Sequence, residues 1–133
     1  PVVDACTSFE AALNVAAANY GEFAYATAGT GNYVNYQDPN VAYTNVVGRT
    51  ALRQSAAAAL SAARTVGIPA EVSDPMQSWS LHATKLLMVM GLRGGGDRLN
   101  ESAAELNSIA DQALNACSLY SSGGRPQAGS QAG

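Results

Sequence analysis

Residues 74–92 (DPMQSWSLHATKLLMVMGL) constrain the fold more than any other stretch, because apolar side chains recur there at steps of three and four residues. This spacing is typical of an amphipathic helix. Asp74 can cap such a helix, Pro75 fits its first turn, and Gln77 completes a capping box. The pattern therefore predicts a helix that begins at Asp74. Its main apolar face consists of Met76, Trp79, Ala83, Leu86 and Met90.

The same stretch carries a second apolar face, roughly opposite the first, which consists of Leu81, Met88 and Leu92. A helix of a bundle normally buries one face, so the second must be covered by another part of the chain or by another molecule. We expect the loop that contains Tyr33 and Tyr36 to cover it, because five of the six tyrosines crowd that part of the chain. The alternative is an exposed binding surface. The candidate residues for binding a ligand or partner are Tyr33, Tyr36, Tyr43, Trp79, Leu81, His82, Met88 and Leu92.

Three further stretches show the helical spacing of apolar side chains, and they cover residues 4–28, 39–66 and 97–120. Asp4, Asp38 and Asp97 stand at their starts and are the expected N-caps. In the second of these helices, Gly48 is expected to weaken or bend the chain, since glycine costs ~1 kcal/mol relative to alanine. Residues 94–96 (GGG) are expected to form a flexible break before the last helix.

Four amphipathic helices joined by polar loops predict an all-α protein folded as a four-helix up-down bundle. We expect one helical domain at residues 1–120. The tail at residues 121–133 has no apolar residue larger than alanine, so we expect it to be disordered. The run SAAAALSAA at residues 55–63 has little side-chain bulk, which predicts close approach of a neighbouring helix.

The polar loop at residues 29–40 has two interpretations. Its tyrosines can anchor an irregular segment onto the bundle, with the apolar ring inside and the hydroxyl in water. They can equally form an aromatic contact patch for a ligand or partner. The sequence favours the anchoring role without excluding the second one.

The composition limits the classes of partner. Hydrophobic residues make up 47% of the chain, whereas only 13% are charged, about half of the usual share. The net charge is -3 and the basic residues are scattered, which argues against a nucleic-acid partner. No run of 18 apolar residues occurs, so no membrane span is expected. The opening PVVDAC, without methionine, favours a mature terminus left after removal of a signal peptide.

The two cysteines lie near the ends of the predicted bundle. Cys6 falls in the first turns of the first helix and Cys117 in the last turns of the fourth, both on apolar faces. In an up-down bundle these two positions are at the same end, so we expect a disulfide that joins the termini. The alternative is a pair of buried free thiols in a cytosolic protein. A disulfide implies an oxidising compartment, in the cell envelope or outside the cell.

The sequence shows little that favours catalysis. It has one histidine, so it lacks a two-histidine metal site, and no G-x-S-x-G motif occurs. The predicted disulfide leaves no cysteine nucleophile. The helical carboxylates, including Glu10, Glu101 and Glu105, fall on the expected polar faces rather than in one cleft. We therefore expect no enzyme and no metal centre.

His82 flanks the main apolar face of residues 74–92 and has two interpretations. It can be a partly buried histidine that hydrogen-bonds within the protein, which we favour. It can also be an axial ligand to haem, with a tyrosine or methionine opposite and apolar walls around it.

An alanine-rich, all-helical chain with one cysteine near each end of its folded part (DACTSF and NACSLY) resembles the small exported helical proteins of mycobacteria and related actinobacteria. One group among them is the haemophore-like proteins, which bind haem outside the cell. The resemblance implies an exported protein and, for that group, haem as cofactor. It carries no individual residue over, because the group uses more than one histidine and this chain has only His82.

The sequence thus favours an exported, non-catalytic helical protein that binds a protein partner or a small apolar ligand in the cell envelope or outside the cell. A haemophore-like haem carrier is the first alternative. A purely structural or antigenic secreted domain is the second.

Overall fold

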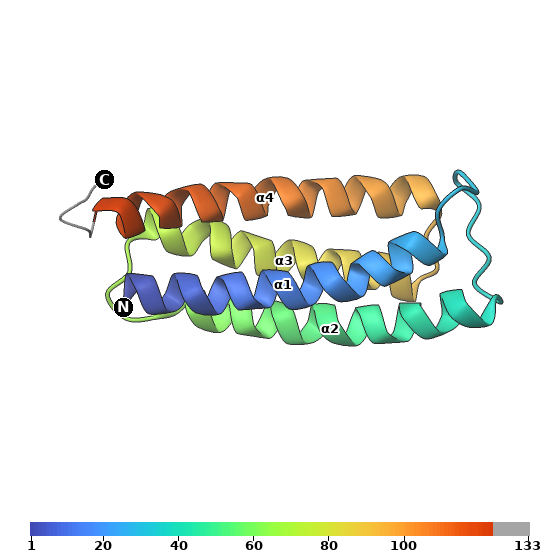
Figure 1. Cartoon of the computed structure of the whole chain (residues 1–133), viewed down its shortest axis with the longest axis horizontal. Helices are drawn as coiled ribbons and strands as arrows, with labels where there is room; N and C mark the ends of the chain where they lie inside the picture. The colour runs from blue at the N-terminus through green and yellow to red at the C-terminus, as the bar shows by residue number, and fades with distance from the viewer. Residues whose placement is uncertain (124–133) are drawn as a thin grey trace.

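The protein is described by a computed structural model, which covers residues 1–123, with side chains through residue 120. Its four helices are α1 (Val2–Ala26), α2 (Pro39–Ala63), α3 (Ala70–Gly91) and α4 (Gly96–Gly123). They run alternately up and down, so that the start of α1 and the end of α4 lie at the same end of the bundle (Figure 1). The predicted all-α, four-helix up-down bundle is confirmed.

The core lies along the centre of the bundle. Every residue of the main apolar face predicted for residues 74–92 is buried, as are Phe9 and Phe23 of α1 and Leu52 of α2. Phe9 and Trp79 pack edge to face in this core. Their ring centroids are 5.7 Å apart, and the angle between the ring planes is 84°. Trp79 therefore belongs to the core rather than to a binding surface, where the sequence analysis placed it.

Small residues let α2 and α3 approach closely. Ala56 and Ala59 are buried, and the hydroxyl of Ser80 donates a hydrogen bond to the backbone carbonyl of Ala56 at 2.6 Å. A Cβ added at Gly48 would lie 3.0 Å from Cε of Met90. The predicted close approach is thus confirmed, and Gly48 serves it by leaving room for the Met90 side chain.

Three helices begin earlier than predicted, and for α4 the difference is one residue, at Gly96. Helix α3 begins at Ala70, after Pro69, so that Asp74 and Pro75 lie inside it. The reason is Val72, which is fully buried and extends the core-facing side of the helix upstream of Pro75. Helix α1 begins at Val2, so Asp4 lies in its first turn, where a carboxylate complements the positive end of the helix dipole.

The other boundaries differ by a few residues. Asp38 caps α2 as predicted, because its side chain accepts hydrogen bonds from the backbone N–H groups of Asn40 and Val41. Helices α1 and α2 end at Ala26 and Ala63, slightly before the expected ends. Helix α4 continues to Gly123 and so includes the first residues of the predicted tail. Residues 124–133, the rest of that tail, lie outside the described part.

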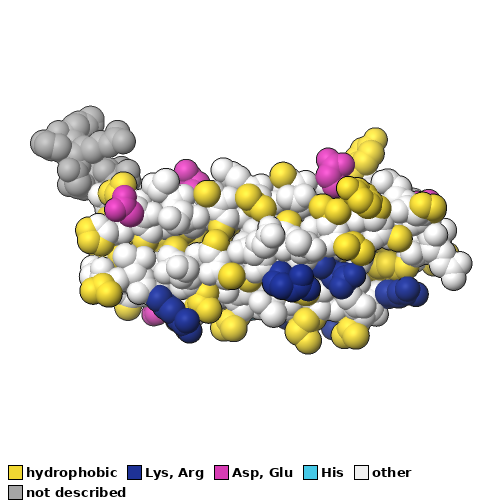
Figure 2. All heavy atoms as spheres, turned by 90° about the horizontal axis from the view of Figure 1, so that it is seen from below, with side chains coloured by type: hydrophobic (Ala, Val, Ile, Leu, Met, Phe, Trp, Pro, Cys, Tyr) yellow, Lys and Arg dark blue, Asp and Glu magenta, His cyan; other side chains and the backbone are white. Residues whose placement is uncertain are grey.

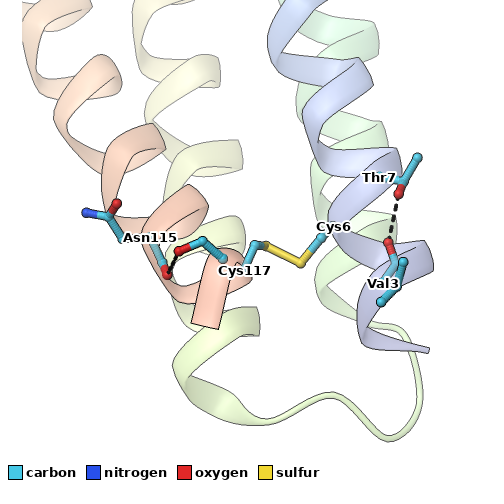
Figure 3. Close-up of a disulfide and its surroundings, with 6 residues drawn as sticks. Val3, Cys6, Thr7, Asn115 and Cys117 are labelled. Carbon is cyan, nitrogen blue, oxygen red and sulfur yellow. Dashed lines mark hydrogen bonds between the residues drawn. A yellow bond between two sulfur atoms is a disulfide. The ribbon is translucent and has the colours of Figure 1, made fainter. Parts of the chain in front are cut away.

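The predicted disulfide joins Cys6 and Cys117, whose Cα atoms are 5.9 Å apart. Figure 3 shows the bridge between the first turns of α1 and the last turns of α4. The hydroxyl of Thr7 donates to the carbonyl of Val3, and that of Ser118 donates to the carbonyl of Asn115. The polar side chains beside the bridge are therefore satisfied within their own helices.

The glycine run between α3 and α4 is closely packed, so the prediction of a flexible break is wrong. Gly96 donates its backbone N–H to the carbonyl of Asn32 at 2.8 Å. The side-chain oxygen of Asn32 accepts from the backbone N–H of Asp97 at 2.9 Å, so it is Asn32 that caps α4. A Cβ on Gly95 would lie 2.5 Å from that same Asn32 oxygen. The loop between α1 and α2 and the connection between α3 and α4 therefore hold each other in place.

Candidate functional site

A groove runs along the surface between α3 and α4, with a volume of about 390 Å³. We call it the α3/α4 groove; it is lined by Leu81, Thr84, Lys85, Met88, Val89, Leu92, Gly94 and Arg98. Three of these residues, Leu81, Met88 and Leu92, are the second apolar face predicted from the sequence, here named the α3 stripe. Over the 11 residues from Leu81 to Leu92, an α-helix rises about 16 Å. The stripe thus follows the groove along three turns of α3.

The α3 stripe is exposed. The exposed fractions of Leu81, Met88 and Leu92 are 66%, 56% and 80%. The prediction that the tyrosine loop covers this stripe is therefore wrong. The tyrosine loop does not reach the stripe because it is held at the end of the bundle. There it packs against the glycine run that connects α3 and α4.

Tyr36 is the residue that anchors the loop. Its hydroxyl donates to the carbonyl of Gly94 at 2.6 Å, and its ring lies 6.3 Å from that of Phe23. Burial raises the pKa of Tyr36, and it raises the pKa of the neighbouring Tyr20 to about 12. The anchoring interpretation thus holds for Tyr36.

Two of the other candidate tyrosines do not share this role. Tyr33 and Tyr43 are 67% and 69% exposed. Tyr33 belongs to the loop and Tyr43 to α2, and neither lines the α3/α4 groove. Of the eight residues proposed from the sequence, the groove brings together Leu81, Met88 and Leu92.

Two cations border the groove. Among the described residues that line it, Lys85 and Arg98 are the charged ones, and no carboxylate joins them. The Lys85 ammonium lies 3.2 Å from a carboxylate oxygen of Glu105 on α4, which offsets part of its charge. Arg98 takes part in no ion pair within the described residues. The groove is thus largely apolar along α3, and its two cations are Lys85 of α3 and Arg98 of α4.

A second, more polar hollow of about 360 Å³ adjoins the groove. It shares Lys85, Val89 and Arg98 with the groove and adds Glu101, Ser102 and Glu105. The hydroxyl of Ser102 is buried and, within the described part of the chain, has no hydrogen-bond partner. A buried hydroxyl without a partner is uncommon, because its desolvation is not compensated.

His82 lies on the side of α3 that faces α4, where both of its ring nitrogens are close to oxygens of the protein. Its Nδ1 is 2.8 Å from the carbonyl oxygen of Ser78, and its Nε2 is 3.6 Å from a carboxylate oxygen of Glu105. The side chain is 30% exposed. This geometry matches the interpretation of a partly buried histidine that hydrogen-bonds within the protein.

Neither a metal cluster nor a membrane-spanning helix is found in the described part of the chain. Among residues 1–120, no three His, Cys, Asp or Glu side chains are clustered so that they could hold a metal ion. No helix in the described range is long and apolar enough to cross a membrane. What α3 and α4 present together is an apolar strip beside two cations.

Basic side chains gather on the face of the bundle that is seen from below in Figure 2. Figure 2 looks onto the bundle from below and shows Lys and Arg side chains in a row across this face, with hydrophobic side chains protruding at its lower edge. Helix α2 carries Arg49 and Arg53 and has no acidic residue. Arg49 donates to the side chain of Asn45, whereas Arg53 is exposed and lines neither hollow.

Three residues of the two hollows were not expected from the sequence, namely Lys85, Arg98 and Ser102. Lys85 had a usable signal, since it stands four residues after Leu81 and three before Met88 and so shares the face of the α3 stripe. Arg98 and Ser102 had none, because they belong to the next helix and meet the stripe only in the folded bundle.

Comparison with known proteins gives one match. The family model described as "Rv2240c four-helix bundle domain" matches residues 1–118. No curated protein and no solved structure matches the chain. The match agrees with a small helical protein of actinobacterial type, whereas the more specific haemophore-like resemblance is not confirmed.

Proposed function

The chain belongs to the Rv2240c four-helix bundle family, and from this premise we propose that it is a non-catalytic protein that binds a small apolar ligand or a protein partner in the α3/α4 groove. We further propose that it works in the cell envelope or outside the cell. The disulfide between Cys6 and Cys117 supports this location, because such bonds persist in oxidising compartments.

The exposure of the α3 stripe carries the proposal. The opposite face of α3 already supplies buried residues such as Met76, Trp79 and Leu86 to the core. The stripe therefore contributes little to the packing of the monomer, while its three large apolar side chains are in contact with water. An apolar groove of this volume falls in the ~300–1,000 Å³ range of small-molecule sites.

A titration with the neutral dye Nile red tests the proposal, because its fluorescence rises and shifts to the blue in apolar surroundings. The oxidised protein is expected to bind the dye, and Met88→Asp to abolish binding by placing a charge in the groove. The matched control is Val66→Asp, since Val66 is 90% exposed and lies between α2 and α3, outside the groove. Both variants should keep the circular dichroism of the parent.

Two results would count against the groove. The first is a parent protein that does not bind the dye and that, in native mass spectrometry after isolation from its own compartment, shows the mass of the chain without any ligand. The second is equal loss of dye binding in Met88→Asp and Val66→Asp.

The haem-carrier alternative has weaker support. Both ring nitrogens of His82 lie near protein oxygens, of Ser78 and Glu105, and the side chain does not line the groove. Adding haem to the protein is expected to leave the Soret band of free haem unchanged. A sharp Soret shift that His82→Ala abolishes would place the haem carrier first.

A further inference from the structure

Taking the α3/α4 groove as the binding site of the proposed function, we infer that its ligand is a single-chain amphiphile with an anionic head group. The apolar chain lies along Leu81, Met88 and Leu92, and the head group lies between Lys85 and Arg98. This inference rests on the proposed function and specifies the chemical class of its ligand.

The shape of the groove fits one extended chain. The α3 stripe is one side chain wide and follows a single helix over about 16 Å. Val89, which also lines the groove, is buried. A flat membrane contact would instead need apolar side chains spread over a broad face, whereas Lys85 interrupts this strip and Arg98 borders it. The occupant is therefore a dispersed amphiphile rather than a bilayer surface.

The charges fix the sign of the head group. The chain carries a net charge of -3, yet the charged residues found along the groove are Lys85 and Arg98. Glu105 pairs with Lys85 at 3.2 Å and offsets part of its charge, whereas Arg98 is exposed and makes no ion pair within the described residues, so Arg98 is the main contact for the head group. The guanidinium of arginine offers parallel N–H donors that match the two oxygens of a carboxylate or the oxygens of a phosphate or sulfate ester.

The hydroxyl of Ser102 is an independent observation that points to the same place. It is buried, has no partner in the described part of the chain, and belongs to the polar hollow that shares Lys85 and Arg98 with the groove and also contains Glu101 and Glu105. The hydroxyl oxygen is not exposed in the unliganded protein, so an oxygen of an anionic head group would accept the missing hydrogen bond once the hydroxyl turns toward the hollow. A cationic or purely apolar ligand would leave the hydroxyl without a partner.

Calorimetric titration of the oxidised, full-length chain distinguishes the head groups. The probes are dodecanoate, dodecanol and dodecyltrimethylammonium, each below its micelle concentration, with phosphatidylglycerol vesicles as the membrane source of the same anionic chemistry. Dodecanoate is expected to bind about tenfold more tightly than dodecanol, the ratio that corresponds to one charge-assisted contact. The cationic probe is expected to bind most weakly, and the vesicles are not expected to bind.

Three variants assign the head-group contact. Arg98→Gln is expected to lower the affinity for dodecanoate about tenfold and to leave dodecanol binding unchanged. Arg98→Lys should restore most of the loss, and the control Arg53→Gln, an exposed arginine on α2, should have no effect. Ser102→Ala should weaken dodecanoate binding while the unliganded protein keeps or gains thermal stability, because the variant removes an uncompensated buried hydroxyl.

The outcomes separate this inference from the proposed function. Equal binding of the three dodecyl probes, or dodecanoate binding that Arg98→Gln leaves unchanged, would overturn the anionic head group while the groove stays a binding site. Binding to vesicles without binding of dispersed dodecanoate would overturn the single-chain ligand. If none of the dodecyl probes binds and Nile red does not bind either, both the inference and the small-ligand form of the proposed function fail.

Discussion

The side-chain oxygen of Asn32 accepts a hydrogen bond from the backbone N–H of Asp97 at 2.9 Å, and this contact joins the first loop to the start of α4. The first N–H groups of a helix have no partner within the helix, so they need an acceptor from elsewhere. Here the acceptor comes from a residue 65 positions earlier in the chain. The contact holds the loop at the end of the bundle and leaves the α3 stripe uncovered.

Asn32→Ala should therefore lower the free energy of unfolding by about 1 kcal/mol, the usual cost of losing a helix cap. The control is Asn107→Ala, on the exposed side of α4, which should be neutral or slightly stabilising because alanine is the better helix former. Urea unfolding followed by circular dichroism measures both. Equal stability of Asn32→Ala and the parent would show that the contact does not cap α4.

A pair of glycines tests how tightly the loop and the α3–α4 junction are packed. A Cβ at Gly96 would press against the backbone carbonyl of Gly31, so Gly96→Ala should cost about 1–3 kcal/mol. Gly21 lies in α1 with nothing within 4 Å of its added Cβ, so Gly21→Ala should stabilise by up to ~1 kcal/mol. Thermal unfolding of the two variants should move in opposite directions. A stabilising Gly96→Ala would mean that the junction is loose after all.

The disulfide closes almost the whole chain, since Cys6 and Cys117 are 111 residues apart. Cys6→Ser/Cys117→Ser should lose up to about 4–5 kcal/mol of stability, the chain-entropy value for so long a loop. Thiol titration of the unfolded, unreduced parent should find no free thiol. Two titratable thiols in that experiment would remove both the bond and the argument for an oxidising compartment.

The stability should also fall in strong base because of Tyr20. Burial, with a smaller contribution from Tyr36, raises the pKa of Tyr20 from 10.0 to about 12. The folded state then keeps its proton where the unfolded chain has lost it, so stability is full below pH 10 and falls as the pH rises toward 12. Tyr20→Phe should flatten this part of the denaturant-midpoint curve. An unchanged slope in that variant would assign the pH dependence to other groups.

Much of the fold follows from the sequence because its information is local. The spacing of Met76, Trp79 and Leu86 defines a face whatever the neighbouring helix is, and Asp38 caps the helix that directly follows it. The start of α3 was misplaced because a strong local signal at Asp74 and Pro75 lies five residues inside a helix that Val72 anchors in the core.

The site could be predicted only in part, for the same reason. The α3 stripe can be predicted from the sequence of one helix, because its residues fall on a different side of that helix from the main apolar face. Whether it is covered depends on where the loop lies, and that is decided by contacts of Asn32 and Tyr36 with the α3–α4 junction, about 60 residues away. Arg98 and Ser102 reach the groove from another helix, so no periodicity within α3 indicates them.

The free energy of unfolding of Leu81→Asp, measured together with its binding of Nile red, tests the central claim most directly. Because Leu81 is 66% exposed, the variant should change stability by less than about 0.5 kcal/mol and should lose dye binding. Leu86→Ala, at the buried face of the same helix, is the comparison and should cost about 2–5 kcal/mol. A loss of several kcal/mol in Leu81→Asp, or full dye binding by a stable Leu81→Asp, would contradict the assignment of the α3 stripe as a binding surface.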